Sequence, residues 1–433
     1  MSASPASDAP TGPRLRRALG LPALVVFGLA YVAPISVFTT YGVATVLSRG
    51  QLPLSYFVAT LAMLLTALSY ASLARWFPEA GSVHTYGSRV LHPNVGFLAG
   101  WAIALDYVMI PVVNLIIAGI FGASLVPLIP AWVWMCAALA GATTANVLGI
   151  ETTDRSARVV LVVEVVALLV FIAVAGVRSP ASVVVWPAVT WPPVFAAASI
   201  VAISFLGFDA VTTLAEEARQ PQRDVPRAVI ITCLVSGGLF FAVTAVAFRA
   251  YPATTFPDID AAGFTAAEAI GGATLAALVA VGELVGSFAS ALAGQAGAAR
   301  LIYGISRDTG LGHGVLDRLH ATRHVPIGAV GALALAGGLA FVLSLEQVVS
   351  LINFGALTGF LVVHVAAIRE GLRRHPTRTA WVWARHVAVP VVGAAFVATL
   401  LWSLSSTALT VGGTWLLIGS AVLVLRGRRR SPV

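Results

Sequence analysis

The sequence predicts an all-α integral membrane protein with twelve transmembrane helices, and three observations support this prediction. Of its 433 residues, 58% are hydrophobic and only 10% are charged, whereas about 25% of the residues in soluble domains are charged. Apolar runs of about 20 residues, the length of a helix that crosses a bilayer, recur along the whole chain. The basic residues, all of them arginine, gather in short clusters between these runs. This composition excludes a soluble globular protein, and the scattered arginines argue against a nucleic-acid partner.

Each predicted span is an apolar run bounded by polar, proline-containing or glycine-containing segments. In chain order the expected spans are 21–46, 52–74, 94–121, 127–148, 158–177, 193–214, 227–249, 273–299, 326–344, 347–368, 387–406 and 408–425. Residues 1–20 are polar and rich in proline and serine, which predicts a disordered cytoplasmic tail. Residues 426–433 predict a basic cytoplasmic tail.

The arginines predict the orientation of these spans. With the N-terminus in the cytoplasm, 23 of the 26 arginines fall on the cytoplasmic side, and only Arg49, Arg178 and Arg249 fall outside. Cytoplasmic loops of membrane proteins carry an excess of Lys and Arg. We therefore expect a multi-pass protein of the plasma (inner) membrane with both termini in the cytoplasm and the loop 250–272 outside.

Two spans contain residues that weaken a helix. The first reads "GLAYVAPISVFTTYG", with Gly28, Pro34 and Gly42, and the sixth reads "ISFLGFDAVTTLAEE", with Gly207 beside Asp209. Breaks in spans five apart indicate two five-helix units of opposite orientation, each with a discontinuous first helix, as in many secondary transporters. The alternative for the first span is a simple proline kink, which is common in membranes.

Three further motifs resemble those of the amino acid–polyamine–organocation transporter superfamily. They are "FPEAGSVHTY" (77–86), "FLGFDAVTTLAEE" with "PQRDVPRAV" after it, and "ARLIYGISRDTGLG" (299–312). Within that superfamily the chain is most similar to bacterial putrescine importers. The resemblance implies a transport core of ten helices in two inverted repeats, residues 21–368, with two peripheral helices, residues 387–425. It also implies uptake driven by a cation gradient.

The sequence departs from the putrescine importers in three places. Thr39 stands where those importers carry an aspartate, and Glu164 and Glu283 stand where they carry uncharged residues. Several proton-coupled relatives carry a lysine at the position of Glu164. The family is therefore better defined than the substrate.

Four carboxylates fall inside predicted spans, and each costs about 2.5–3.5 kcal/mol at the centre of a bilayer. Asp209 follows the Gly207 break, where it either binds an ammonium group or caps the second half-helix. Asp106 and Tyr107 precede Pro111 by one turn. The resemblance to putrescine importers implies that Tyr107 lines the pocket, and the alternative is that Asp106 stabilises a kink. The residues expected to bind substrate are Ala33, Pro34, Ile35, Ser36, Thr39, Asp106, Tyr107, Phe205, Gly207, Phe208 and Asp209.

Glu164 and Glu283 are the predicted coupling residues. The implied fold places their helices beside the broken part of the first span, and two neighbouring carboxylates at low dielectric cannot both ionise easily. We expect them to share a proton, the alternative being that each is satisfied by hydroxyl or backbone groups. Glu216 and Glu217 are expected to form ion pairs with nearby arginines at the cytoplasmic gate.

These residues favour a secondary transporter that imports a small organic cation, such as a putrescine-like polyamine. We expect import by cation symport, with a proton as the coupling ion and sodium as the alternative. The competing substrate is a cationic or neutral amino acid, taken up or exchanged. Its carboxylate would need backbone N–H groups of the first span, where Pro34 supplies none. An intramembrane enzyme, a channel and a sensor are the other classes considered. We expect no cofactor and no metal site, because no two histidines have a metal-binding spacing.

Overall fold

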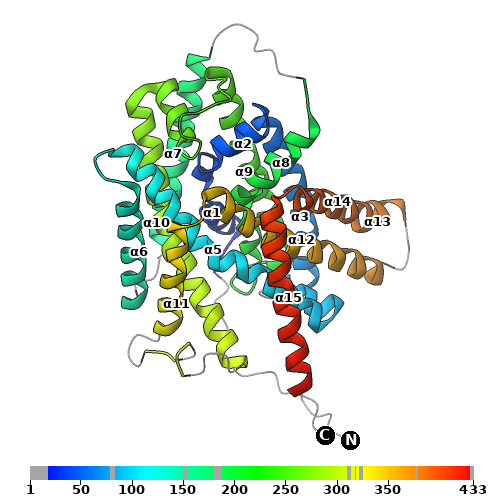
Figure 1. Ribbon diagram of the computed structural model, residues 1–433. Helices are drawn as coiled ribbons and strands as arrows, with labels where there is room; N and C mark the ends of the chain where they lie inside the picture. Colours follow the sequence, from blue (N-terminus) through cyan, green and yellow to red (C-terminus); the bar gives the residue numbers. More distant parts are fainter. Residues whose placement is uncertain are drawn as a thin grey trace, which may run out of the picture.

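The computed structural model describes residues 18–78, 83–149, 154–179, 188–309, 314–316, 318–320, 325–375 and 379–429, and within these ranges every regular element is a helix (Figure 1). Helices dominate because the bilayer offers no partner for backbone N–H and C=O groups. The elements are α1 (Leu21–Val32), η1 (Pro34–Val37), α2 (Tyr41–Leu47), α3 (Leu52–Trp76), α4 (Val83–Tyr86), η2 (Gly87–Leu91), α5 (Pro93–Leu125), α6 (Ala131–Leu148), α7 (Asp154–Arg178), α8 (Trp191–Val201), η3 (Ala202–Phe205), η4 (Phe208–Leu214), α9 (Pro221–Ala250), α10 (Ala262–Thr309), α11 (Ile327–Gly337), η5 (Gly338–Phe341), α12 (Leu345–Arg374), α13 (Ala380–Trp383), η6 (Ala384–Ala388), α14 (Val389–Trp402) and α15 (Ser406–Arg429).

The prediction of an all-α membrane protein is confirmed. Among the described residues, ten helices are long and apolar enough to cross a membrane. Leu21–Val32 and Pro34–Leu47, two helices bent by 41° at a break, are long and apolar enough only together, and they make an eleventh span if the pair crosses as one. The segment expected at 326–344 is a shorter apolar helix, Ile327–Phe341. The count of twelve spans and the inverted repeat therefore stay predictions.

One predicted boundary is wrong. The segment 250–272 is expected to be a loop, but α10 already begins at Ala262, and only residues 251–261 are extended or turned. Gly272 has a φ of 72° and a ψ of −172°, which interrupts the helix between its two parts. The alanine-rich stretch before Gly272 favours helix. Gly272 therefore lies at a kink within α10 and not at the boundary between a loop and a helix.

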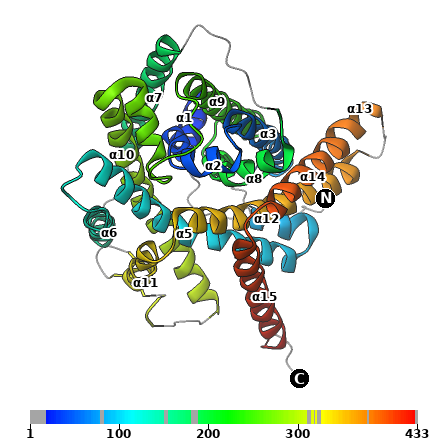
Figure 2. The same cartoon turned by 45° about the horizontal axis from the view of Figure 1, so that its top comes forward.

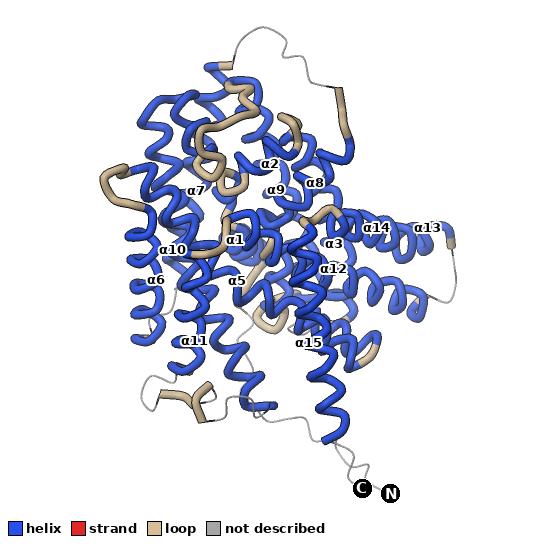
Figure 3. Tube along the Cα trace, in the orientation of Figure 1, coloured by secondary structure: helices blue, strands red, loops and turns tan. Residues whose placement is uncertain are grey.

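Two groups of helices enclose the broken spans. α3 packs along α9, and α5 packs along both α10 and α12. Figure 2 shows α1, α2, α3, α8 and α9 gathered on one side of α5, whereas α6, α11 and α15 lie at the periphery. In Figure 3 short non-helical segments interrupt the helices near the centre of the bundle. Ile35, Phe205 and Phe208, beside the breaks in the first and sixth spans, are buried, so these breaks lie inside the packed bundle.

Candidate functional site

The first span is unwound in its middle, as the sequence predicts. α1 ends at Val32, and Ala33 adopts a left-handed conformation with a φ of 50°. A short 3-10 turn, η1, follows from Pro34, and α-helical geometry resumes only at Tyr41. A non-glycine residue with positive φ is uncommon and costs energy. The break is therefore a built feature and more than a proline kink.

The sixth span is broken at Leu206 and Gly207. Leu206 is extended, with a ψ of 132°, and Gly207 has a φ of 111°, a conformation that glycine adopts without strain. A Cβ atom at Gly207 would lie 3.1 Å from the carbonyl oxygen of Tyr31 and closer still to its ring. The absence of a side chain at Gly207 thus lets the break in the sixth span touch the end of α1.

Asp209 is anchored directly after this break. The hydroxyl of Tyr70 in α3 donates to Oδ2 of Asp209 at 3.0 Å, and the backbone N–H groups of Gly207 and Ala210 also face this carboxylate. Tyr70 is fully buried and packs edge-on against Phe208, with ring centroids 6.0 Å apart. Backbone and hydroxyl donors therefore hold this carboxylate in place, as the capping interpretation expects, and the binding of an ammonium group by Asp209 stays a prediction.

A second carboxylate and further tyrosines lie within electrostatic range of Asp209. Asp106 of α5 interacts with Asp209, and Tyr31 interacts with both. One oxygen of Asp106, Oδ1, is buried and has no hydrogen-bond partner. No described basic residue forms an ion pair with either carboxylate. The members of this group, which we call the acidic–tyrosine cluster, are Tyr31, Tyr70, Tyr86, Tyr107, Asp106 and Asp209.

Glu283 lies on the other side of the first break. The hydroxyl of Thr39 donates to Oε1 of Glu283 at 3.1 Å and to Oε2 at 3.3 Å. Glu283 is 2% exposed and Glu164 is 1% exposed, and the two carboxylates interact electrostatically. The backbone N–H of Ile35 faces Glu164, whose Oε2 has no hydrogen-bond partner. The expected meeting of these glutamates beside the first break is thus present in the structure.

A glycine makes room for this pair. A Cβ at Gly286, one turn beyond Glu283, would lie 2.6 Å from Oε1 of Glu164 and 3.5 Å from the Ile35 side chain. The close approach of α7 to α10 therefore depends on glycine at this position. We call Thr39, Glu164 and Glu283 the coupling triad, after the role that the sequence predicts for the two glutamates.

Comparison with known proteins identifies the family. Residues 22–425 match the model of the family described as amino acid permease. The chain belongs to this family. It is 32% identical to the low-affinity putrescine importer PlaP of Escherichia coli K12 over 97% of the chain and 96% of that protein. It is also 28% identical to the branched-chain amino acid permease BcaP of Bacillus subtilis, over 97% of the chain and 95% of that protein. The resemblance to the amino acid–polyamine–organocation superfamily is confirmed, and the protein is a membrane transporter and not an enzyme.

The predicted substrate residues of the permease lie in three places. Asp106, Tyr107 and Asp209 belong to the acidic–tyrosine cluster, and Phe208 packs behind it against Phe360, with centroids 5.6 Å apart. The residues Ala33, Pro34, Ile35 and Ser36 form the break, and Thr39 contacts Glu283. Phe205 instead packs edge-on against Phe240 of α9 at 5.1 Å.

The predicted gate residues lie where the chain leaves the sixth span. Glu216 is exposed and Glu217 half-buried. The backbone N–H of Leu19 donates to the Glu217 carbonyl at 3.0 Å, and the backbone N–H of Arg219 donates to the Leu19 carbonyl at 2.8 Å. The segment before α1 is thus paired with the segment after η4. Residues 79–82 of the "FPEAGSVHTY" motif lie outside the described residues.

Three tyrosines of the permease's cluster were missed by sequence reasoning. Tyr31, Tyr70 and Tyr86 come from α1, α3 and α4. Tyrosine is common in membrane helices and at their ends, so their positions in the sequence carry no signal for a site.

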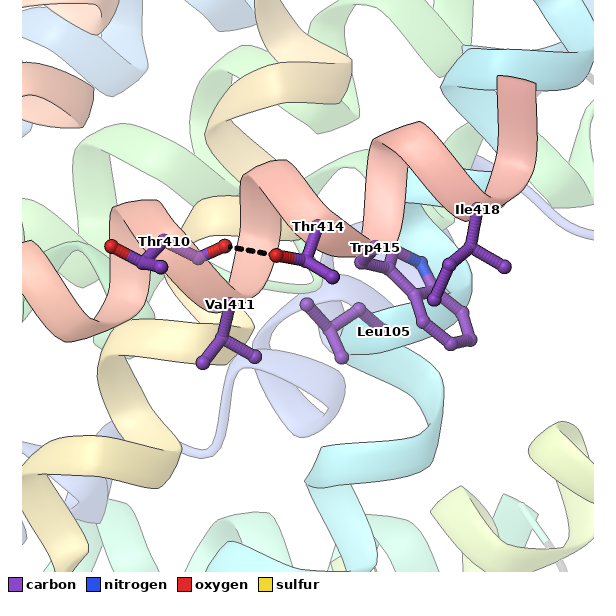
Figure 4. Close-up of a pocket in the computed structure, with 6 residues that line it drawn as sticks. All are labelled: Leu105, Thr410, Val411, Thr414, Trp415 and Ile418. Carbon is purple, nitrogen blue, oxygen red and sulfur yellow. Dashed lines mark hydrogen bonds between the residues drawn. The ribbon is translucent and has the colours of Figure 1, made fainter. Parts of the chain in front are cut away.

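One apolar cavity of the permease lies away from this cluster. It has a volume of about 230 Å³ and lies between α5 and α15, where Figure 4 shows Leu105 opposite Val411 and Trp415. Its lining contains no ionisable side chain. The acidic–tyrosine cluster is therefore the better candidate site for a charged solute. Leu105, which lines the cavity, directly precedes Asp106 in the sequence.

Proposed function

We propose that this permease imports a small organic cation, a putrescine-like amine, together with a proton. One observation carries the proposal: Asp106 and Asp209 lie in one cluster with four tyrosines and no described basic partner. Two half-buried acids inside a membrane span without a counter-charge are costly. An ammonium group supplies the missing charge, and tyrosine rings also attract cations.

The backbone at the first break favours an amine over an amino acid. The N–H of Ala33 donates to the Leu29 carbonyl, and the N–H of Ser36 donates to the Ala33 carbonyl. Pro34 has no N–H, and the N–H of Ile35 faces Glu164. Each of these positions therefore lacks a free backbone donor for a substrate carboxylate.

An amino acid remains the second candidate because of Ser36. Its hydroxyl is buried at the break and has no hydrogen-bond partner, so it could donate to a carboxylate. The likeness to a branched-chain amino acid permease points the same way.

Competition for uptake into proteoliposomes separates these candidates. Labelled putrescine is the reporter, and putrescine, leucine and arginine are the competitors. The proposal expects competition by putrescine and none by leucine at the same concentration. Saturable uptake of labelled leucine, with no saturable uptake of labelled putrescine, would contradict it and favour the amino acid.

The coupling triad supports the proton as the driving ion. Glu164 and Glu283 are buried and close in a part of the chain where no described cation neutralises them, so one proton shared between them lowers the cost of burial. Their contacts with Ile35 and Thr39 link this proton to the first break. Protonation would thereby favour one arrangement of the gates. A protonophore should abolish accumulation, and accumulation that follows a sodium gradient instead would contradict this assignment.

A further inference from the structure

A basic pocket lies between α3, α9 and η6, and no member of the coupling triad lines it. Its volume is about 80 Å³. Three arginines line it: Arg75 from the last turn of α3, Arg227 from the second turn of α9, and Arg385 from η6. All three fall in groups that the sequence analysis assigns to the cytoplasmic side.

These arginines lack the partners that normally accompany converging positive charges. Each is exposed, and Arg75 and Arg385 are close enough to repel one another. In the described part of the chain, none of the three is in an ion pair with a carboxylate, whereas Arg373 and Arg374 both pair with Glu370. The pocket therefore has unneutralised charge that an anion would stabilise.

The rest of the pocket is apolar. Leu68, Ile230 and Val389 line it and are half-buried at the periphery of the bundle. Beside it, Trp381 is 63% exposed, and the guanidinium of Arg385 lies 5.2 Å from the centre of the Trp381 ring. Exposed tryptophans mark the level of lipid headgroups, so the pocket lies where headgroup and acyl chain meet.

We propose that this pocket binds the phosphate of an anionic phospholipid. Arginine matches phosphate oxygens with paired N–H donors, and basic pockets between membrane helices bind anionic headgroups. A volume close to that of a few water molecules suits a single phosphate group. The apolar wall accommodates the first carbons of the acyl chains. A free phosphate ion has no apolar part that could contact this wall. The bound lipid would tie α3 to α9 and η6.

Native mass spectrometry of the full-length protein tests this site. The protein is extracted from vesicles of phosphatidylcholine with 20% phosphatidylglycerol, and retained lipid is counted. Wild type should retain phosphatidylglycerol. Arg75→Gln/Arg385→Gln should lose about 30-fold in affinity, as expected from roughly 1 kcal/mol for each arginine near an anionic surface. The matched control Arg318→Gln/Arg369→Gln removes the same charge outside the pocket and should retain lipid.

A second variant keeps the proposal testable if the arginine variant fails to fold. Ser72→Trp fills the pocket from the α3 side and leaves all three arginines, so it should also release phosphatidylglycerol. Equal retention by Ser72→Trp and wild type would overturn the site. Thermal stabilisation of wild type by inorganic phosphate alone, equal to that by phosphatidylglycerol, would overturn the lipid assignment in favour of a soluble anion.

Discussion

The hydroxyl of Thr39 donates to both carboxylate oxygens of Glu283, across 244 positions of the chain. Thr39 belongs to the unwound part of the first span, and Glu283 belongs to α10. Putrescine importers, by the resemblance, carry an aspartate at the position of Thr39. In this chain Thr39 supplies a hydroxyl there, and the carboxylate of the contact comes from Glu283. The charge state of Glu283 can therefore act on the break through one hydrogen bond.

Glu283→Gln should uncouple transport from the proton. The amide keeps the size of the side chain and can accept a hydrogen bond from Thr39, but it cannot ionise. Exchange of internal for external putrescine should stay within about twofold of wild type, because exchange needs no net proton movement. Accumulation against a gradient should disappear, along with its increase at lower external pH. Both are measured in proteoliposomes.

Glu268→Gln is the matched control for this variant, since Glu268 is an exposed glutamate on the same helix. It should behave as wild type. If Glu283→Gln and Glu164→Gln both concentrate putrescine and a protonophore still collapses the gradient, the proton travels elsewhere and the triad is structural.

Gly207→Ala should destabilise the protein. The φ of 111° is strained for alanine, and the new methyl group would meet Tyr31. A strained residue costs about 1–3 kcal/mol, which should lower the midpoint of thermal unfolding in detergent. Gly176→Ala is the comparison, because a Cβ there meets nothing within 4 Å and alanine favours helix. An unchanged midpoint for Gly207→Ala would mean that the break relaxes freely.

Much of this architecture follows from the sequence, because glycine, proline and buried charge have few uses in an apolar helix. Pro34, Gly207 and Asp209 each stand out against their neighbours and predict the two breaks. Glu283 stands out in the same way and predicts a carboxylate beside the first break. Tyr70 does not stand out, although it fixes Asp209, because its role depends on which helix packs opposite. The kink at Gly272 was missed for a similar reason, since a glycine between two helical stretches also fits a loop.

Labelling of single cysteines tests the predicted orientation. In a background in which the exposed Cys136 and the buried Cys233 are replaced, a cysteine at the exposed Thr255 should react with an impermeant maleimide added to intact cells. A cysteine at His320 should react only after the membrane is opened. The reverse pattern would invert the arginine-based orientation and the cytoplasmic placement of the basic pocket.

Tyr70→Phe should weaken substrate binding while leaving the protein folded. The ring keeps its packing against Phe208 and Phe360, but Asp209 loses its 3.0 Å hydroxyl donor. A hydrogen bond to a charged group contributes about 1.5–3 kcal/mol, and part of this should appear as an increase in KM of roughly tenfold. A lower rate at saturation with unchanged KM would instead assign Tyr70 to the conformational change.

Binding of putrescine to Asp209→Asn tests the central claim most directly. Equilibrium binding to purified protein in detergent needs no gradient, so it reports the acidic–tyrosine cluster without the coupling triad. Removal of one charged hydrogen bond to an ammonium group should lower the affinity of Asp209→Asn for putrescine by about 10–150-fold. The unfolding midpoint of this variant should not change. The control Glu268→Gln should bind putrescine with wild-type affinity. Wild-type affinity in Asp209→Asn would contradict the account and leave Asp209 as the cap of the second half of the sixth span.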